Sequence, residues 1–241
     1  MNSPTSFSLT SDSHPLDNVI WTALTTRQAS LSEGNDVARR FNPAFARFAG
    51  LADANATRLD ALAPVVPVSE GVAVETSVDI TPSPYFDLVD VKNVVLMVGP
   101  AVGPTINPHR FTVLGPQHKS QMAALVKLTE PGPWAERTSE FGRFIGELDG
   151  DQLVAMTGER MHVPGYREIS GVCTHPSWRG KGLARDLMLA VSQAIVARGE
   201  VPFLHVLAEN ATAIALYERL GFTEHKRCKL VVVSRSDRAV D

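Results

Sequence analysis

The residues best suited to chemistry lie together in one stretch, where small and basic residues alternate. Residues 179–182 read Arg-Gly-Lys-Gly and follow Pro176, whose missing N–H ends strand pairing. A helical pattern begins directly after them, with aliphatic residues at every fourth position: Leu183, Leu187, Val191 and Ile195. A glycine turn at the start of a helix points several free N–H groups at one place, and the helix dipole adds positive potential there. The stretch therefore predicts a site for a phosphate or pyrophosphate group.

The glycine turn alone leaves the ligand open. It is not a Walker A loop, because Lys181 is followed by Gly182 rather than by Ser or Thr. It is not a dinucleotide fingerprint either, because no Gly-x-Gly-x-x-Gly follows the first strand of a βαβ unit. Considered by itself, the turn is equally well explained as a glycine-rich entry to a helix that binds nothing.

A second motif follows the next predicted strand. It reads Asn210-x-x-Ala213-x-x-x-Tyr217-x-x-x-Gly221-Phe222. Together with Arg179-x-x-Gly182-x-Ala184, it resembles the double signature of the GNAT superfamily of N-acetyltransferases. The resemblance covers roughly residues 111–233. More loosely, residues 131–233 resemble an acyltransferase subgroup in which a degenerate half precedes the catalytic half.

The resemblance implies an α/β fold with a mixed central sheet of the GNAT type, preceded by a smaller α/β N-terminal half. It implies acetyl-CoA as co-substrate, with the pyrophosphate in the amide nest of the glycine turn. The pantetheine arm would run beside strand 168–174 like an added strand, and Asn210 would hold it from the following helix. The implied acetyl-CoA-binding residues are Val172, Cys173, Thr174, Arg179, Gly180, Lys181, Gly182, Leu183, Ala184, Arg185 and Asn210.

The resemblance also implies direct attack of an acceptor amine on the thioester, without an enzyme nucleophile. Tyr217 resembles the acid that protonates the departing thiolate, and Glu168 is the candidate base, directly or through water. A partly exposed strand-end carboxylate without a catalytic role is the alternative for Glu168. His205 is an alternate base, or a histidine satisfied in the core or the cleft. Cys173 is interpreted as a small buried hydrophobic residue rather than as a nucleophile.

A mixed α/β arrangement must position these residues. Trp134 and Arg137 lie in the break after its first helix and are candidates for contacting the acceptor. The predicted elements are a strand at 111–114, a helix at 117–128, a hairpin of strands 143–148 and 152–157 around Asp149-Gly150, a strand at 168–174, a helix from 183, a strand at 202–207, a helix at 210–220 and a strand at 229–233.

The first 104 residues carry no predicted chemistry. His14 is interpreted as a solvated residue near a loose arm of about 15 residues, and three phenylalanines (Phe41, Phe45 and Phe48) as core. The predicted elements are helices at 18–28, 37–51 and 59–67, strands at 71–75 and 91–98, and a connector at 99–104. The predicted domains are an N-terminal α/β region of unknown role (1–104) that contributes one wall of a substrate cleft, an acetyl-CoA-binding GNAT domain (105–235) and a tail (236–241).

Composition excludes several other classes of protein. With 241 residues, 44% of them hydrophobic and 20% charged, the chain has the composition of an ordinary globular protein. A net charge of −3 without a basic run predicts no nucleic-acid partner, and the longest apolar run, near 94–98, is too short to cross a membrane. The N-terminus lacks a signal-peptide pattern. The two cysteines have no zinc-site or disulfide spacing, which predicts no metal and a reducing cytoplasm.

The resulting hypothesis is a cytoplasmic N-acetyltransferase, monomeric or homodimeric, that acts on a small-molecule or peptide amine. The competing hypothesis is a non-catalytic acyl-CoA-binding sensor module. Tyr217 and Glu168 favour the enzyme, because a sensor needs neither an acid nor a base.

Overall fold

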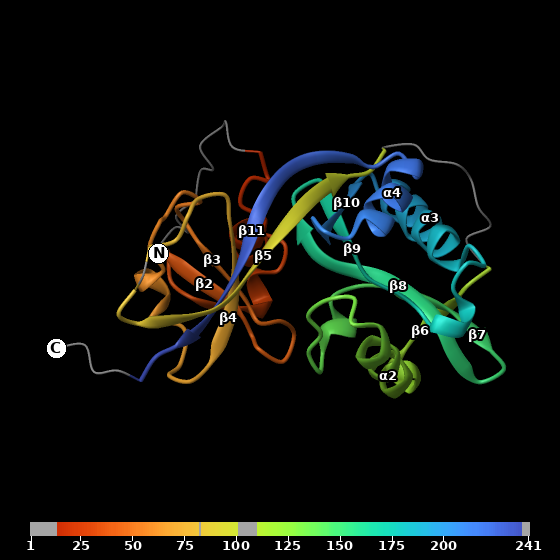
Figure 1. The fold of residues 1–241 in the computed structure, drawn as a ribbon, viewed down its shortest axis with the longest axis horizontal. Helices are drawn as coiled ribbons and strands as arrows, with labels where there is room; N and C mark the ends of the chain where they lie inside the picture. The colour runs from red at the N-terminus through yellow and green to blue at the C-terminus, as the bar shows by residue number, and fades with distance from the viewer. Residues whose placement is uncertain (1–13, 82, 101–109, 238–241) are drawn as a thin grey trace, which may run out of the picture.

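One continuous sheet carries the whole fold (Figure 1). The computed structural model describes residues 14–81, 83–100 and 110–237. The strands are β1 (Ser32–Gly34), β2 (Ala38–Phe41), β3 (Phe48–Leu51), β4 (Gly71–Thr76), β5 (Phe86–Val98), β6 (Thr112–Leu114), β7 (Phe144–Asp149), β8 (Gln152–Val163), β9 (Tyr166–Thr174), β10 (Val201–Leu207) and β11 (Thr223–Arg235). The helices are α1 (Val19–Thr25), α2 (Lys119–Thr129), α3 (Leu183–Val196) and α4 (Ala211–Arg219).

The sheet mixes parallel and antiparallel pairs. Its order is β1-β2-β3-β4-β11-β5-β10-β9-β8-β7-β6. Only β3 with β4 and β9 with β10 pair in parallel among the described strands. The predicted mixed α/β fold is therefore confirmed. Strand β5 lies between β11 and β10, and Figure 1 shows β5 and β11 as long curved strands that cross from one half of the molecule to the other. The sheet thus runs across the predicted division at residue 104.

Most elements of the second half lie where they were predicted. The β7–β8 hairpin turns at Asp149-Gly150, and Gly150 has a φ of 56°, which glycine adopts without strain. Helices α2 and α3 cover opposite faces of β8. This follows from two neighbouring residues, Leu153 and Val154, whose side chains point to opposite faces of the strand. Leu153 packs in the cluster that contains α2, and Val154 in the cluster that contains α3.

The first half departs from the predicted helices. The segment predicted as a helix at 37–51 forms β2 and β3 instead. The spacing of its phenylalanines fits a helix, but all four residues of β3 are buried, so the strand shows no alternation that would reveal it. Gly50 lets α1 pack directly on β3, because a Cβ there would lie 2.7 Å from the Trp21 nitrogen. The predicted helix at 59–67 reduces to one 3-10 turn, Asp60–Leu62, before Pro64 and Pro67.

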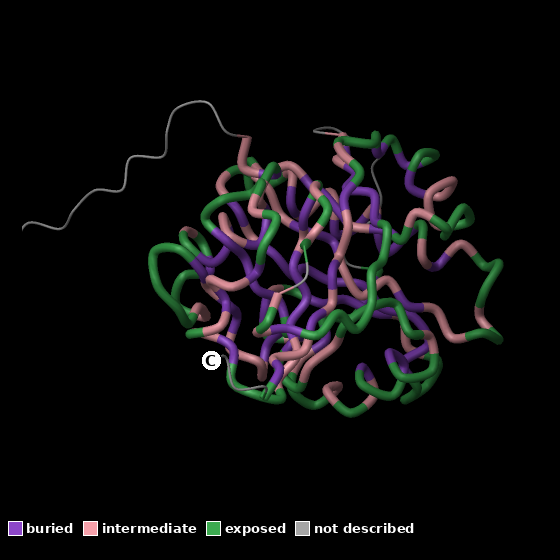
Figure 2. Tube along the Cα trace, turned by 60° about the vertical axis from the view of Figure 1, so that its left-hand side comes forward, coloured by how far each residue is buried: buried purple, intermediate pink, exposed green. Residues whose placement is uncertain are grey.

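The core joins the two halves. Ile20, Phe41 and Phe48 of the first half pack in one cluster with Met161 and Phe203 of the second, and Figure 2 shows the buried trace running through the middle of the molecule. Of the predicted connector at 99–104, only Gly99 and Pro100 lie within the described residues. Across the described ranges, no helix has both the length and the apolar character needed to span a membrane.

Candidate active site

The site forms where two parallel strands separate. Strands β9 and β10 pair only between residues 166–168 and 201–203. Past these residues the strands diverge, and a cleft of about 940 Å³ opens between them. Gly171, with a φ of 63°, interrupts the register of β9 against β8 at this point, as a β-bulge does. The main chain of β9 beyond Glu168 is therefore not paired with β10 and can bind an extended ligand.

One end of the cleft has the features of an anion site. Gly180 and Gly182 have φ values of 76° and 78°, a left-handed conformation that favours glycine. Helix α3 starts at Leu183, and its first helical hydrogen bond runs from Asp186 N–H to Gly182 O, at 3.1 Å. The N–H groups of residues 183–185 therefore have no partner within the helix. A Cβ on Gly180 would meet no atom within 4 Å, so its backbone angle, rather than crowding, requires the glycine in this structure.

The structure brings most of the predicted site residues to this one cleft. Three of them do not line it: Lys181, Cys173 and Glu168. The Lys181 ammonium lies 3.8 Å from the centre of the Trp178 ring. Cys173 is buried, and burial raises the pKa of its thiol to about 11, which suits the predicted inert role. The residues that line the cleft are Val172, Thr174, Arg179, Gly180, Gly182, Leu183, Ala184, Arg185, Asn210 and Tyr217.

Three polar side chains that line the cleft differ in what they offer a ligand. Asn210 caps α4, since its Oδ1 accepts from Ala213 N–H at 3.1 Å, which leaves its amide NH₂ for a ligand. Thr174 Oγ1 is buried and has no hydrogen-bond partner within the described part of the chain. Burial raises the pKa of Tyr217 to about 12, so its hydroxyl stays protonated and can act as an acid.

Glu168 is more strongly engaged than a free base would be. Arg160 donates to both carboxylate oxygens, at 2.8 and 2.7 Å, and Met161 N–H donates at 3.1 Å. His205 Nδ1 lies 2.8 Å from Glu168 Oε1. Burial opposes ionisation, but Arg160 and then His205 outweigh it and hold the pKa of Glu168 far below its usual range. The alternative of a partly exposed carboxylate is wrong, because Glu168 has no exposed surface.

A residue of the first half completes this cluster. Glu75 on β4 lies with Oε2 3.0 Å from His205 Nε2 and with Oε1 2.6 Å from Lys226 Nζ. Burial opposes ionisation of Glu75, but His205 and Lys226 lower its pKa to about 2. Burial likewise opposes charge on His205, whereas Glu75 and Glu168 raise its pKa to about 9. Sequence reasoning missed Glu75; its one signal was a carboxylate inside an otherwise apolar strand.

An apolar part of the cleft wall comes from the first half and from β11. Glu75 and His205 also line the cleft. Trp134 and Arg137 do not line it: Trp134 packs against Phe144, and Arg137 pairs with Glu140. The apolar lining residues of the wall are Ile20, Phe48, Val72, Ala73, Leu230 and Val232.

Comparisons with known proteins agree with this geometry. A family model described as FR47-like protein matches residues 145–231. A solved structure of a GNAT-family protein from Novosphingobium aromaticivorans is 35% identical, with a TM-score of 0.86, and the match covers 93% of this chain and 100% of that one. The mycothiol acetyltransferase of Corynebacterium efficiens is 36% identical over 80 residues, which is 33% of this chain. The ribosomal protein bS18-alanine N-acetyltransferase of Salmonella typhimurium is 33% identical over 97 residues, or 38% of this chain.

The match to curated relatives is partial. It spans 27% of the length of the C. efficiens protein and 66% of that of the S. typhimurium protein. The N. aromaticivorans structure, by contrast, is matched over its whole length, with both halves of the fold in place. The chain belongs to the GNAT family of acetyltransferases.

Proposed function

We propose that this protein transfers an acetyl group from acetyl-CoA to a primary amine by direct attack. The observation that carries the proposal is the convergence, on one cleft, of the glycine turn, the unpaired edge of β9 and the Tyr217 phenol. An anion site, a surface for an extended arm and a proton donor are the three features that a CoA thioester needs.

The donor end of the cleft supports acetyl-CoA. The N–H groups of residues 183–185 and the Arg179 side chain offer donors and charge to a pyrophosphate. The open edge of β9 at Val172 and Thr174 offers main-chain hydrogen bonds to the pantetheine arm, and the unpartnered Thr174 hydroxyl offers one more. In this proposal two residues contribute through their main chain alone. The Lys181 ammonium lies over Trp178, and the Cys173 thiol is buried.

The transfer needs no enzyme nucleophile, because the bonds formed and broken balance between the amine and the thioester. The amine nitrogen forms a bond to the thioester carbonyl carbon, the C–S bond breaks, and the Tyr217 hydroxyl gives its proton to the departing thiolate. The amine must lose one proton. Glu168 and Glu75 are weak bases because their pKa values are lowered, whereas neutral His205 is a strong one. We therefore assign the proton to His205, which it reaches through the Glu75 carboxylate that lines the cleft beside the ring, with Glu168 as the positioning residue on the other nitrogen.

The acceptor is a small molecule or a protein in this proposal. Among the relatives, one is named a mycothiol acetyltransferase and another a ribosomal protein bS18-alanine N-acetyltransferase. The apolar wall around Phe48 and Leu230 favours an amine attached to an apolar body.

A screen of acceptors tests the proposal. Purified protein would be mixed with acetyl-CoA and a panel of small amines and peptides with free N-termini, and thiol release and product mass would be measured. We expect turnover with at least one primary amine and an acetylated product. Binding of acetyl-CoA without turnover of any amine would favour the sensor hypothesis instead.

A further inference from the structure

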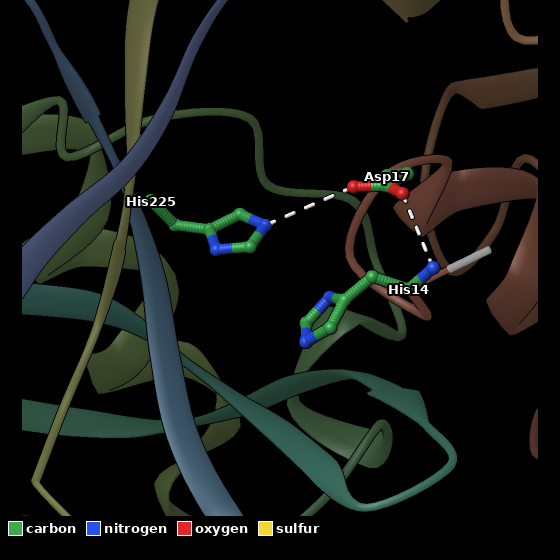
Figure 3. A group of neighbouring side chains, drawn as sticks. All are labelled: His14, Asp17 and His225. Atoms are coloured by element: carbon green, nitrogen blue, oxygen red, sulfur yellow. Dashed lines mark hydrogen bonds and ion pairs between the residues drawn. The ribbon is translucent and has the colours of Figure 1, made fainter. Parts of the chain in front are cut away.

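Two histidines and an aspartate that do not line the cleft converge beside it (Figure 3). His14 and Asp17 belong to the segment before α1, and His225 belongs to β11. One nitrogen of each imidazole and one Asp17 oxygen all lie within 4.8 Å of one another. Figure 3 shows both rings and the carboxylate facing the same space between the segment and the strand.

The three side chains approach each other without hydrogen bonding to one another. His225 Nε2 lies 3.9 Å from Asp17 Oδ1, which is too long for a hydrogen bond. The two imidazole rings have centroids 4.8 Å apart and are tilted by 33°. The other oxygen of Asp17 accepts from the His14 main-chain N–H at 3.1 Å, and this bond holds the carboxylate beside the rings. The cluster thus brings three possible ligand atoms within reach of a shared centre.

The His14 ring is already oriented. Its Nε2 lies 2.9 Å from Tyr166 Oη, and its Nδ1 accepts from Leu16 N–H at 3.2 Å. Because Nδ1 accepts a hydrogen bond, the proton of the neutral ring is on Nε2. Nδ1 is therefore the nitrogen that can bind an ion when the Leu16 contact is released, while the Nε2–H bond to Tyr166 Oη keeps the ring in place. Such partners on the second nitrogen are a regular feature of histidines that bind metals. His14 is thus half-buried and hydrogen bonded rather than solvated, while residues 1–13 of the expected loose arm lie outside the described residues.

We propose that His14, Asp17 and His225 bind a divalent transition-metal ion of the zinc type. Two imidazoles and one carboxylate suit such ions, whereas Mg²⁺ and Ca²⁺ prefer oxygen ligands alone. Bonds of about 2.0–2.2 Å place tetrahedral ligand atoms roughly 3.3 Å apart. Each ligand atom must therefore move inward by about 1.5 Å at most, and the exposed Asp17 and His225 side chains have room to do so.

The neighbouring lysine does not oppose the ion. Lys226 Nζ donates to the Asp17 carbonyl oxygen at 2.9 Å and lies 2.6 Å from Glu75 Oε1, so its charge is paired. An ion at the cluster fastens the segment before α1 to β11, next to the Glu75–His205 pair of the cleft. We therefore expect it to stabilise the fold.

Titration calorimetry tests the site directly. The full chain, without an affinity tag that contains histidine, would be treated with a chelator, dialysed and titrated with Zn²⁺. Two variants, Asp17→Asn and His225→Ala, each remove one ligand. His118→Ala is the control, because His118 is an accessible histidine that lies outside the cluster. Titration with Mg²⁺ tests for general cation binding.

The expected result is one Zn²⁺ per chain with micromolar affinity, unchanged in His118→Ala and weakened about tenfold or more in each ligand variant. Zn²⁺ should raise the melting temperature of the wild type but not of His225→Ala, and Mg²⁺ should bind far more weakly. Wild-type affinity in both ligand variants, or no saturable Zn²⁺ binding to the wild type, would overturn the proposal. Because Asp17→Asn nearly preserves shape, it remains decisive if His225→Ala lowers stability in the chelator.

Discussion

At the scale of single residues, the site is governed by where its charges are placed. Glu168 and His205 were both candidates for the base, and the structure gives them different environments. The Glu168 carboxylate accepts two hydrogen bonds from Arg160. His205 lies between two carboxylates, which raise its pKa to about 9. The stronger base is thus the histidine, and the carboxylates hold it in place.

The pH dependence of turnover follows from this arrangement. Only neutral His205 can accept a proton, so kcat/KM should rise with pH through about 9. The measurement uses an amine acceptor whose own pKa lies below about 7, so that its titration does not add to the profile. In His205→Gln, kcat/KM should fall and lose this rise. A wild-type profile that is flat between pH 7 and 10 contradicts the assignment of the base.

Stability should follow pH in the opposite direction. The pKa of His205 is raised from 6.5 to about 9, so its contribution is complete below 6.5 and is lost as pH rises through 9. The shift corresponds to an upper limit of about 3 kcal/mol. Urea unfolding at pH 6.5 and pH 9.5 should show a larger loss for the wild type than for His205→Gln. An equal loss in both proteins would show that the ion pairs around His205 contribute nothing.

Glu75 determines how the stability contributed by the same cluster falls at low pH. Its pKa is lowered from 4.5 to about 2, so its contribution is complete above 4.5 and is lost as pH falls toward 2. Glu75→Gln should therefore unfold with a weaker dependence on pH between 5 and 2 than the wild type, as measured by circular dichroism. An acid transition that matches the wild type would contradict the ion pair between Glu75 and His205.

At the scale of elements, two turns offer a matched pair of glycines. Gly180 in the turn before α3 and Gly165 in the turn before β9 have φ values of 76° and 78°, and a Cβ on either meets no atom within 4 Å. An alanine at each position costs about 1–2 kcal/mol of strain. Only Gly180→Ala should also raise the KM for acetyl-CoA, because only Gly180 lines the cleft. Equal KM values in the two variants would argue against pyrophosphate binding at the turn.

The elements of the second half could be predicted because their patterns are local. The Asp-Gly hairpin, the four-residue spacing in α3 and the cap at Asn210 all act within a few residues. Strands β2 and β3 could not be predicted, because their burial comes from α1 and from distant strands. The same holds for the site: the turn and Tyr217 have local motifs, whereas the pairing of Glu75 with His205 depends on strand order across 130 residues.

At the scale of the whole molecule, one sheet contains strands of both halves. Strand β5 pairs with both β10 and β11, so residues 105–241 alone lack the strand between them. We expect that fragment to unfold without a cooperative transition, whereas the full chain melts in a single one, as circular dichroism would show. A cooperative, compact fragment would mean that the predicted division at residue 104 separates independent domains.

The central claim is that Tyr217 gives its proton to the departing thiolate in a cleft that binds acetyl-CoA. Its most direct test compares Tyr217→Phe with the wild type in two assays on the same preparations: the affinity for acetyl-CoA by calorimetry and the turnover of the best amine from the acceptor screen. We predict that the affinity stays within about twofold while kcat falls roughly 10²-fold. Wild-type turnover in Tyr217→Phe would contradict the account.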